Sequence, residues 1–255
     1  MVIRILPNPD EVNRLVTEEF IHLAEKAIRQ KGFFSAALPG GSTPKSLYTL
    51  LGSDRYQKQV LWPKVHLFWG DERCVPPDHP ESNYHMIHKL LIGKIPIPEE
   101  NIHRMPAELE DHNRAATEYE QTIRMFFRLG AGELPRFDLI LLGMGEDGHT
   151  ASLFPGTAVL EEKNHLVFAS YIEKFGTYRL TLTVPVINQA ANIIFLIFGG
   201  SKAFILKDVI EGRYEPDRLP SQLIRPVNGR LFFIMDRAAA GKLRNLKGEV
   251  IGGYL

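Results

Sequence analysis

Residues 137–149, Phe-Asp-Leu-Ile-Leu-Leu-Gly-Met-Gly-Glu-Asp-Gly-His, join an apolar run to a glycine-rich turn. The run is apolar on both faces over most of its length, which is typical of a strand covered on two sides. The turn that follows has three glycines within six residues, which implies a tight backbone path. Because ligands bind beyond the carboxyl ends of strands in open parallel sheets, this turn is a candidate functional site.

Apolar runs of the same kind recur along the chain, and helical patterns lie between them. The runs predict strands at residues 2–6, 33–38, 65–69, 137–142, 166–170, 179–183, 193–198 and 231–235. Three- and four-residue apolar spacing predicts helices over 10–32 and 111–129, with shorter helices after Pro44, Ser82, Val184 and Ser201. This alternation predicts an α/β fold on a mostly parallel sheet with right-handed crossovers. No repeat or linker divides the chain, so we expect a single domain over 1–255.

The charge balance narrows the classes of protein to which the chain can belong. In its 255 residues, 30 Lys and Arg offset 30 Asp and Glu, which argues against a broad surface for nucleic acid or anionic membrane. The most apolar stretch, 192–200, falls well short of the ~20 residues of a membrane-spanning helix. With Cys74 as its only cysteine and no recognisable secretory leader, we expect a protein of the reducing cytoplasm.

A first turn, Leu-Pro-Gly-Gly-Ser-Thr-Pro-Lys at 38–45, directly follows an expected strand and precedes an expected helix. Gly40 and Gly41 let the backbone approach a ligand closely, Ser42 or Thr43 can cap the helix, and the following proline suits its first position. Free N–H groups at such a place favour an anion, here a phosphate. A plain glycine turn with a helix cap is the alternative.

A second turn, Gly-Asp-Glu-Arg-Cys-Val-Pro at 70–76, follows the strand expected at 65–69. Asp71 and Glu72 offer carboxylates for sugar hydroxyls or proton transfer, and Arg73 offers a guanidinium for bidentate recognition of phosphate. A solvated, charged loop is the alternative for this segment.

The third turn, which continues to Gly156, contains Asp147 and His149, two candidates for an acid–base pair. Imidazole titrates near neutral pH, so His149 can take a proton from water and return it to a leaving group. In the alternative, both side chains only satisfy loop backbone groups.

Together these turns resemble the 6-phosphogluconolactonase family over nearly the whole chain. The resemblance rests on Leu-Pro-Gly-Gly-Ser-Thr-Pro at 38–44, Trp-Gly-Asp-Glu-Arg at 69–73, Ser-Asn at 82–83, Gly-Met-Gly-Glu-Asp-Gly-His-Thr-Ala-Ser-Leu-Phe-Pro at 143–155, Arg-Leu-Thr-Leu-Thr at 179–183, Gly-Gly at 199–200 and Asp-Arg-Ala-Ala-Ala at 236–240. It implies a Rossmann-like, mostly parallel sheet flanked by helices, similar to the glucosamine-6-phosphate deaminase fold.

The resemblance also implies hydrolysis of 6-phospho-D-glucono-1,5-lactone, without a cofactor or metal. His149 is the expected general base for the attacking water, and Asp147 orients it or binds a sugar hydroxyl. Arg73, Arg179 and Lys202 are the cations expected at the phosphate. The only expected partner is this phosphorylated lactone, bound by a monomer or homodimer with no affinity for nucleic acid or membrane.

Two other functions fit parts of the pattern. In a deaminase or isomerase, Asp71 would abstract a proton next to a carbonyl, but the resemblance implies Asn at position 147 and an aromatic residue at 73 for that family. A sugar-phosphate-sensing module is the other alternative. Regulators of that kind carry a DNA-binding helical domain before the sensor, whereas here the first expected strand begins at Val2, the net charge is zero and both Asp147 and His149 are present. His79, His85 and His88 are read as surface residues, and Cys74 is assigned no role.

Overall fold

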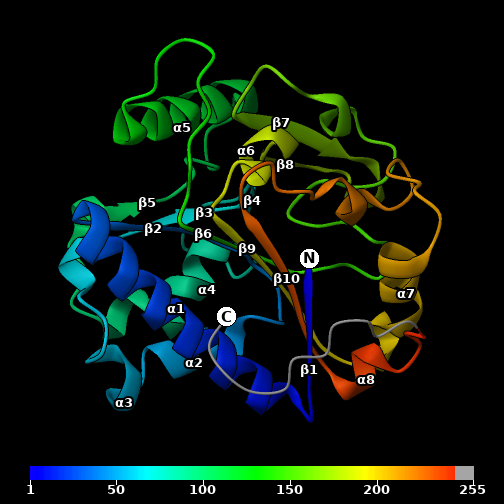
Figure 1. Cartoon of the computed structure of the whole chain (residues 1–255). Coiled ribbons are helices and arrows are strands. Elements are labelled where there is room, and N and C mark those ends of the chain that lie inside the picture. Colours follow the sequence, from blue (N-terminus) through cyan, green and yellow to red (C-terminus); the bar gives the residue numbers. More distant parts are fainter. Residues whose placement is uncertain (245–255) are drawn as a thin grey trace.

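The computed structural model describes residues 1–244, and a parallel sheet of seven strands forms its centre (Figure 1). The strands lie in the order β1-β10-β9-β6-β2-β3-β5. Their bounds are β1 Val2–Leu6, β2 Phe34–Leu38, β3 Val65–Trp69, β5 Ile102–His103, β6 Leu139–Leu142, β9 Asn192–Ile197 and β10 Arg230–Asp236. The predicted α/β class and six of the expected strands are therefore confirmed in this sheet.

The helices connect and cover these strands. They are α1 Pro9–Lys31, α2 Lys45–Leu51, α3 Asp54–Gln57, α4 Asn83–Leu90, α5 His112–Phe127, α6 Val184–Asn188, α7 Ala203–Glu211 and α8 Arg237–Ala240. In α1 the Asn8 side chain accepts the Glu11 N–H at 3.0 Å, and Gly32 ends the helix in the left-handed region (φ +87°). The boundaries expected from sequence are thus close to those observed.

Three further strands form a separate antiparallel sheet, in the order β4-β8-β7, which the sequence did not predict. β7 (Val167–Ile172) and β8 (Thr177–Leu182) form a hairpin, and β4 (Asp71–Arg73) pairs with β8. In Figure 1 this sheet lies with α5 at the top, whereas α1 to α3 lie at the lower left. The runs expected at 166–170 and 179–183 are strands, but their short connection makes them antiparallel neighbours.

The large sheet changes direction between β2 and β6. From β2 the order continues through β3 to β5, and from β6 it continues through β9 and β10 to β1. Such a switch point creates a crevice at the carboxyl ends of the two strands. The turns after Leu38 and Leu142 therefore lie next to each other at the carboxyl ends of β2 and β6.

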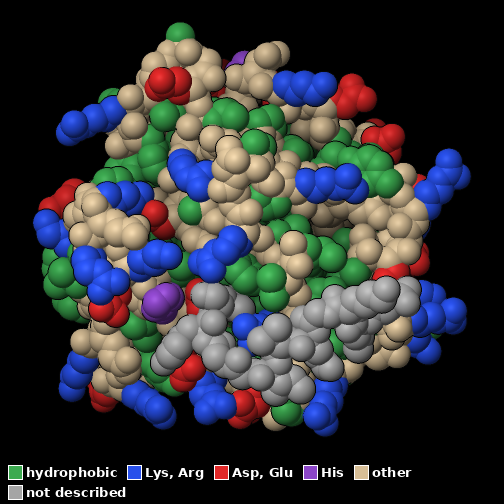
Figure 2. All heavy atoms as spheres, in the orientation of Figure 1, with side chains coloured by type: hydrophobic (Ala, Val, Ile, Leu, Met, Phe, Trp, Pro, Cys, Tyr) green, Lys and Arg blue, Asp and Glu red, His purple; other side chains and the backbone are tan. Residues whose placement is uncertain are grey.

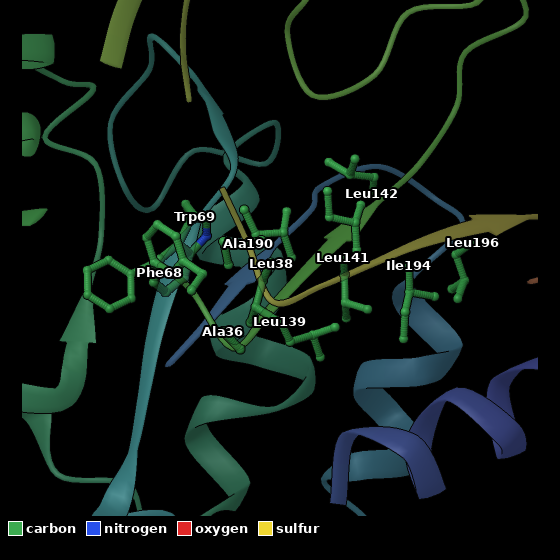
Figure 3. Close-up of a cluster of buried hydrophobic side chains, with 14 of the residues drawn as sticks. Ala36, Leu38, Phe68, Trp69, Leu139, Leu141, Leu142, Ala190, Ile194 and Leu196 are labelled. Atoms are coloured by element: carbon green, nitrogen blue, oxygen red, sulfur yellow. The ribbon is translucent and has the colours of Figure 1, made fainter. Parts of the chain in front are cut away.

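Buried side chains on β2, β3, β6 and β9 hold the carboxyl ends of these strands in place (Figure 3). Leu38, Trp69 and Leu142 are the last residues of their strands, and each is fully or almost fully buried. The core thus extends up to the residues from which the three turns depart. Over residues 1–244, no helix is long and apolar enough to cross a membrane.

Candidate active site

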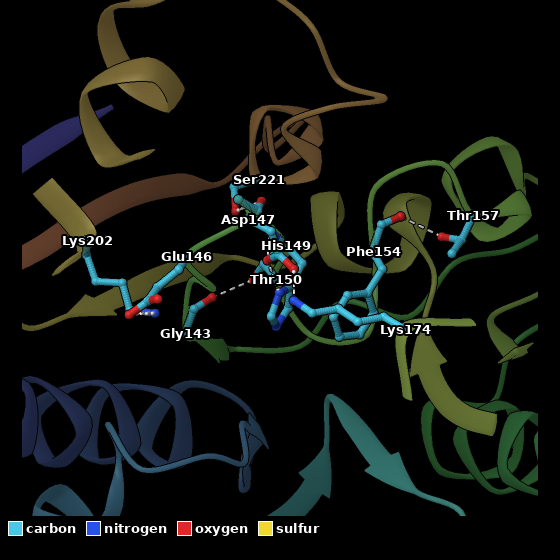
Figure 4. A network of polar contacts seen from close by, with 11 residues as sticks. Gly143, Glu146, Asp147, His149, Thr150, Phe154, Thr157, Lys174, Lys202 and Ser221 are labelled. Atoms are coloured by element: carbon cyan, nitrogen blue, oxygen red, sulfur yellow. Dashed lines mark hydrogen bonds and ion pairs between the residues drawn. The ribbon is translucent and has the colours of Figure 1, made fainter. Parts of the chain in front are cut away.

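The third turn brings the predicted acid–base pair into direct contact (Figure 4). Asp147 Oδ1 and His149 Nδ1 form a hydrogen bond. The other carboxylate oxygen, Oδ2, accepts a hydrogen bond from Lys174 Nζ at 3.2 Å. Each oxygen of Asp147 therefore has its own partner, one on the same turn and one on the hairpin between β7 and β8.

The charge state of Asp147 settles which ring nitrogen of His149 carries a proton. Burial raises the pKa of Asp147, but the hydrogen bonds and positive charges of His149 and Lys174 outweigh it and hold the pKa well below its usual range. An ionised carboxylate can only accept, so Nδ1 is the donor. In the neutral imidazole, Nε2 then keeps its lone pair, as a general base requires.

Packing fixes the plane of the imidazole. The ring of Phe154 stacks on that of His149, with centroids 4.0 Å apart and an interplanar angle of 26°. A Cβ on Gly145 would lie 2.1 Å from His149 Nδ1, so this position has no room for a side chain. Ser221 ties down the same turn, because its hydroxyl donates to the Gly148 carbonyl at 2.8 Å. Gly145 therefore leaves the room that the His149 ring occupies.

In the second turn, Glu72 is a structural residue and not a free carboxylate. Its oxygens accept the backbone N–H groups of Arg73, Asn83 and Tyr84 at 2.7–2.8 Å, and also the Ser82 hydroxyl at 3.2 Å. The side chain is buried, and this burial raises the pKa of Glu72. Glu72 thus holds the start of α4 against β4, and the alternative of a solvated loop is wrong for this segment.

Asp71 links the second turn to the other two. One of its carboxylate oxygens accepts the Ser152 hydroxyl at 2.7 Å, and the other lies 3.5 Å from Asn83 Nδ2. Asn83 Nδ2 also donates to the Asp71 carbonyl at 2.9 Å. A Cβ on Gly40 would lie 1.7 Å from Asn83 Oδ1, so the first turn packs directly on this amide.

Arg73 and Arg179 are brought together, as expected for a phosphate site. They are direct partners in the antiparallel ladder of β4 and β8. Burial lowers the pKa of Arg179, and the charge of Arg73 lowers it further. Like charges opposite each other are unfavourable in a sheet, so a bound anion would relieve this repulsion. Lys202 precedes α7 and lies 3.9 Å from Glu146 on the third turn.

The first turn differs from expectation in two respects. Neither Ser42 nor Thr43 caps α2, and Pro44 is not its first residue, because the helix begins at Lys45 and Pro44 itself is the cap residue, without a side-chain hydrogen bond. Gly41 has φ +87°, a conformation that favours glycine. The two side chains thus remain available to a ligand.

Sequence reasoning missed Lys174, Asn83, Ser152 and Phe154 as parts of the site. Asn83, Ser152 and Phe154 lie inside the stretches that carried the family resemblance, but Lys174 belongs to no motif. Of the residues described, no three His, Cys, Asp or Glu side chains are grouped as metal ligands would be. Burial raises the pKa of the Cys74 thiol to about 11, so this side chain is not a reactive thiolate near neutral pH.

The switch point of the sheet and the three turns beside it define a Rossmann-like α/β protein with a candidate ligand site at the carboxyl ends of its strands. The chain belongs to the family described as glucosamine-6-phosphate isomerases/6-phosphogluconolactonase, which matches residues 7–233. A 6-phosphogluconolactonase of Synechocystis sp. is 42% identical over 219 residues, covering 86% of this chain and 88% of that protein. The predicted family is therefore confirmed.

Solved structures agree with this assignment. The 6-phosphogluconolactonase from Trypanosoma cruzi superposes with a TM-score of 0.83 at 29% identity, covering 96% of this chain and 97% of that one. A monomeric glucosamine-6-phosphate deaminase shares the fold alone, with a TM-score of 0.79 at 20% identity and coverage of 95% and 100%. The fold class inferred from the sequence is confirmed.

Proposed function

We propose that this chain is a 6-phosphogluconolactonase, which hydrolyses 6-phospho-D-glucono-1,5-lactone to 6-phospho-D-gluconate in the oxidative pentose phosphate pathway. The observation that carries the proposal is the hydrogen-bonded Asp147–His149 pair at the switch point of the sheet. The relative from Synechocystis sp., at 42% identity over most of both chains, bears the lactonase name and supports the same reaction.

In the proposed mechanism, Nε2 of His149 takes a proton from a water molecule while the water oxygen attacks C1 of the lactone. The tetrahedral intermediate then collapses, the bond from C1 to the ring oxygen breaks, and Nε2 returns the proton to that oxygen. Asp147 stabilises the imidazolium formed in between, because its carboxylate stays ionised next to Nδ1. No acyl-enzyme is needed, since water is the nucleophile throughout.

The cations and the first turn would hold the rest of the substrate. Arg73 and Arg179 lie next to each other on β4 and β8 and are assigned to the dianionic phosphate, with Lys202 as a third cation. The backbone around Gly40, Gly41, Ser42 and Thr43 lies at the phosphate or lactone end. Asp71 can accept a sugar hydroxyl if it gives up its 3.5 Å contact with Asn83.

The test is the decay of freshly made lactone, followed with 6-phosphogluconate dehydrogenase as the coupling enzyme and corrected for spontaneous opening. The native protein should accelerate the decay, and His149→Ala should lower kcat by about 10²- to 10⁴-fold with a much smaller change in KM. His88→Ala, at an exposed position on α4, is the control and should keep native kinetics. Near-native turnover in His149→Ala would rule out the assignment of the base.

A different outcome would redirect the assignment. If the native protein gives no acceleration over background, release of ammonia from an amino-sugar phosphate becomes the next assay. A deaminase would show it, whereas a lactonase would not. Binding of sugar phosphates without turnover would instead indicate a sensing module.

The proposal extends to the setting of the protein. We infer a cytoplasmic monomer or homodimer that binds neither nucleic acid nor membrane. Lys and Arg side chains are dispersed among Asp and Glu on the face drawn in Figure 2, which supports the absence of a strongly basic surface there. Light scattering on purified protein would decide between monomer and dimer.

A further inference from the structure

The hairpin between β7 and β8 places two side chains at the acid–base pair. The ladder ends with Ile172 opposite Thr177, and Gly176 turns the chain in the left-handed region (φ +61°). Lys174 and Phe175 lie between these points, at the tip of the hairpin. Their side chains are well exposed, Lys174 by 64% and Phe175 by 49%, so the core does not account for their placement.

Both side chains instead contact the residues around His149. Lys174 Nζ donates to Asp147 Oδ2 at 3.2 Å, on the oxygen that His149 does not use (Figure 4). Phe175 lies edge-on against Phe154, with centroids 5.7 Å apart at 77°, and Phe154 stacks on the imidazole. The hairpin tip thus reaches the catalytic pair by a polar route and by an aromatic one.

The polar route has a defined physical effect. A carboxylate bonded through one oxygen can rotate about its Cβ–Cγ bond, whereas one bonded through both oxygens to separate partners has its plane fixed. Lys174 also contributes to the low pKa of Asp147, and it offsets the negative charge next to the imidazole. A fixed and ionised acceptor keeps the Nδ1–H bond aligned, which in turn orients Nε2.

We propose that Lys174 is a positioning residue, which acts through Asp147 to hold His149 in its reactive orientation. The expected effect on kcat rests on the proposed lactone hydrolysis. Lys174 itself need not touch the substrate. Its effect should therefore fall on kcat and depend on the carboxylate of Asp147.

The kinetic test uses three single variants. Lys174→Met should lower kcat by about 5- to 30-fold with KM changed less than about twofold, and Lys174→Arg should recover most of the loss. Lys163→Met, on the exposed segment after Ala158–Glu161, is the matched control and should behave as the native protein. Native kcat in Lys174→Met, or a loss confined to KM, would overturn the proposal.

A double-mutant cycle tests whether the effect passes through Asp147. In an Asp147→Asn background, Lys174→Met should cost less than about a further twofold in kcat, because the carboxylate that it positions is gone. If the double variant loses kcat by the product of the two single losses, Lys174 acts independently of Asp147, for example on the substrate itself. That result would also overturn the proposal.

A spectroscopic test does not depend on any activity. The 15N shifts of the His149 ring, read through its carbon-bound protons and assigned with His149→Gln, should change in Lys174→Met and not in Lys163→Met. Unchanged shifts in Lys174→Met would overturn the role of Lys174. Absence of lactonase activity in the native protein, in contrast, would overturn only the proposed function.

Discussion

At Cys74, burial in the fold affects the pKa of the thiol more than the positive charge of the preceding residue does. Arg73 precedes it, yet burial raises the pKa of the thiol to about 11. Since the thiolate is the reactive form, Cys74 should react very slowly with a disulfide reagent at pH 7–8, and the rate should rise steeply as the pH approaches 11. A urea-unfolded sample is the control and should react at once. Fast reaction of the folded protein at pH 7 would contradict a raised pKa of this half-buried thiol.

Residue type and spacing alone paired only those site residues that lie close together along the chain, whereas Arg179 and Lys202 were named through the family resemblance. Asp147 and His149 share one turn, so glycine spacing and residue type sufficed to pair them. Lys174 could not be found in this way, because it meets Asp147 only after β7 and β8 fold into a hairpin. Glu72 was misjudged for the same reason, since the N–H groups of Asn83 and Tyr84 that occupy it come from a different element.

The first turn and α4 are coupled elements, and Gly40 is where they meet. A methyl group at Gly40 would clash with Asn83, which is fully buried and holds Asp71. Gly40→Ala should therefore destabilise the protein by about 1–3 kcal/mol, measured by urea unfolding, and also lower lactonase activity.

Gly143 provides the matched control for this substitution. A Cβ there would meet nothing within 4 Å, and its φ is not positive. Gly143→Ala should change the free energy of unfolding by less than about 0.5 kcal/mol. Equal losses in the two variants would show that the contact with Asn83 is not the cause.

For whole elements, apolar strands were predicted well and charged ones poorly. The central strands of the large sheet, such as β6 (Leu-Ile-Leu-Leu) and β9 (Asn-Ile-Ile-Phe-Leu-Ile), are almost continuous apolar runs because helices cover both faces. β4 is Asp-Glu-Arg, without any apolar alternation, and it is a strand only because β8 pairs with it. A pattern within one segment cannot reveal such a partner, which lies about a hundred residues away in the sequence.

The stability of the whole molecule should fall in mild acid because of two histidines at the edge of the large sheet. His66 Nδ1 and His103 Nε2 lie 3.1 Å apart, and the His103 ring stacks on Phe68. Burial and, secondarily, His66 lower the pKa of His103 to about 4, and burial lowers that of His66. An unfolded histidine keeps its ordinary pKa of about 6.5. Between about pH 6.5 and pH 4 these two histidines therefore bind more protons in the unfolded chain than in the folded protein.

The free energy of unfolding should accordingly decrease as the pH falls from about 6.5 to about 4. His103→Phe, which keeps a ring on Phe68, should reduce this dependence when urea unfolding is compared at pH 7 and pH 4.5. His88→Phe, at an exposed position on α4, is the control and should keep the native slope. The same slope in His103→Phe as in the native protein would contradict the buried pair as its source.

An anion at the paired arginines should stabilise the whole fold. Inorganic phosphate at about ten times its Kd should raise Tm by about 2–4 °C, because it binds only the folded state. Arg179→Met should abolish this shift without lowering Tm in the absence of phosphate, since the variant also removes the repulsion with Arg73. Arg213→Met, an exposed change, should keep the shift. Equal shifts in all three proteins, or in chloride of matched ionic strength, would argue against this site.

That residues 1–255 form one cooperative domain stays a prediction, since residues 245–255 lie outside the described part of the chain. A single unfolding transition seen alike by circular dichroism and by tryptophan fluorescence would support it. Two separate transitions would show that the small antiparallel sheet unfolds on its own.

The place of β1 in the sheet has a consequence for synthesis on the ribosome. β1 is made first, but its hydrogen-bonded neighbour is β10, which spans Arg230–Asp236. β10 also lies between β1 and β9, so that half of the sheet stays open until β10 leaves the exit tunnel. From the emergence of β9 until that of β10, the nascent chain exposes an unpaired apolar edge at β9, which is where a chaperone would be expected to bind.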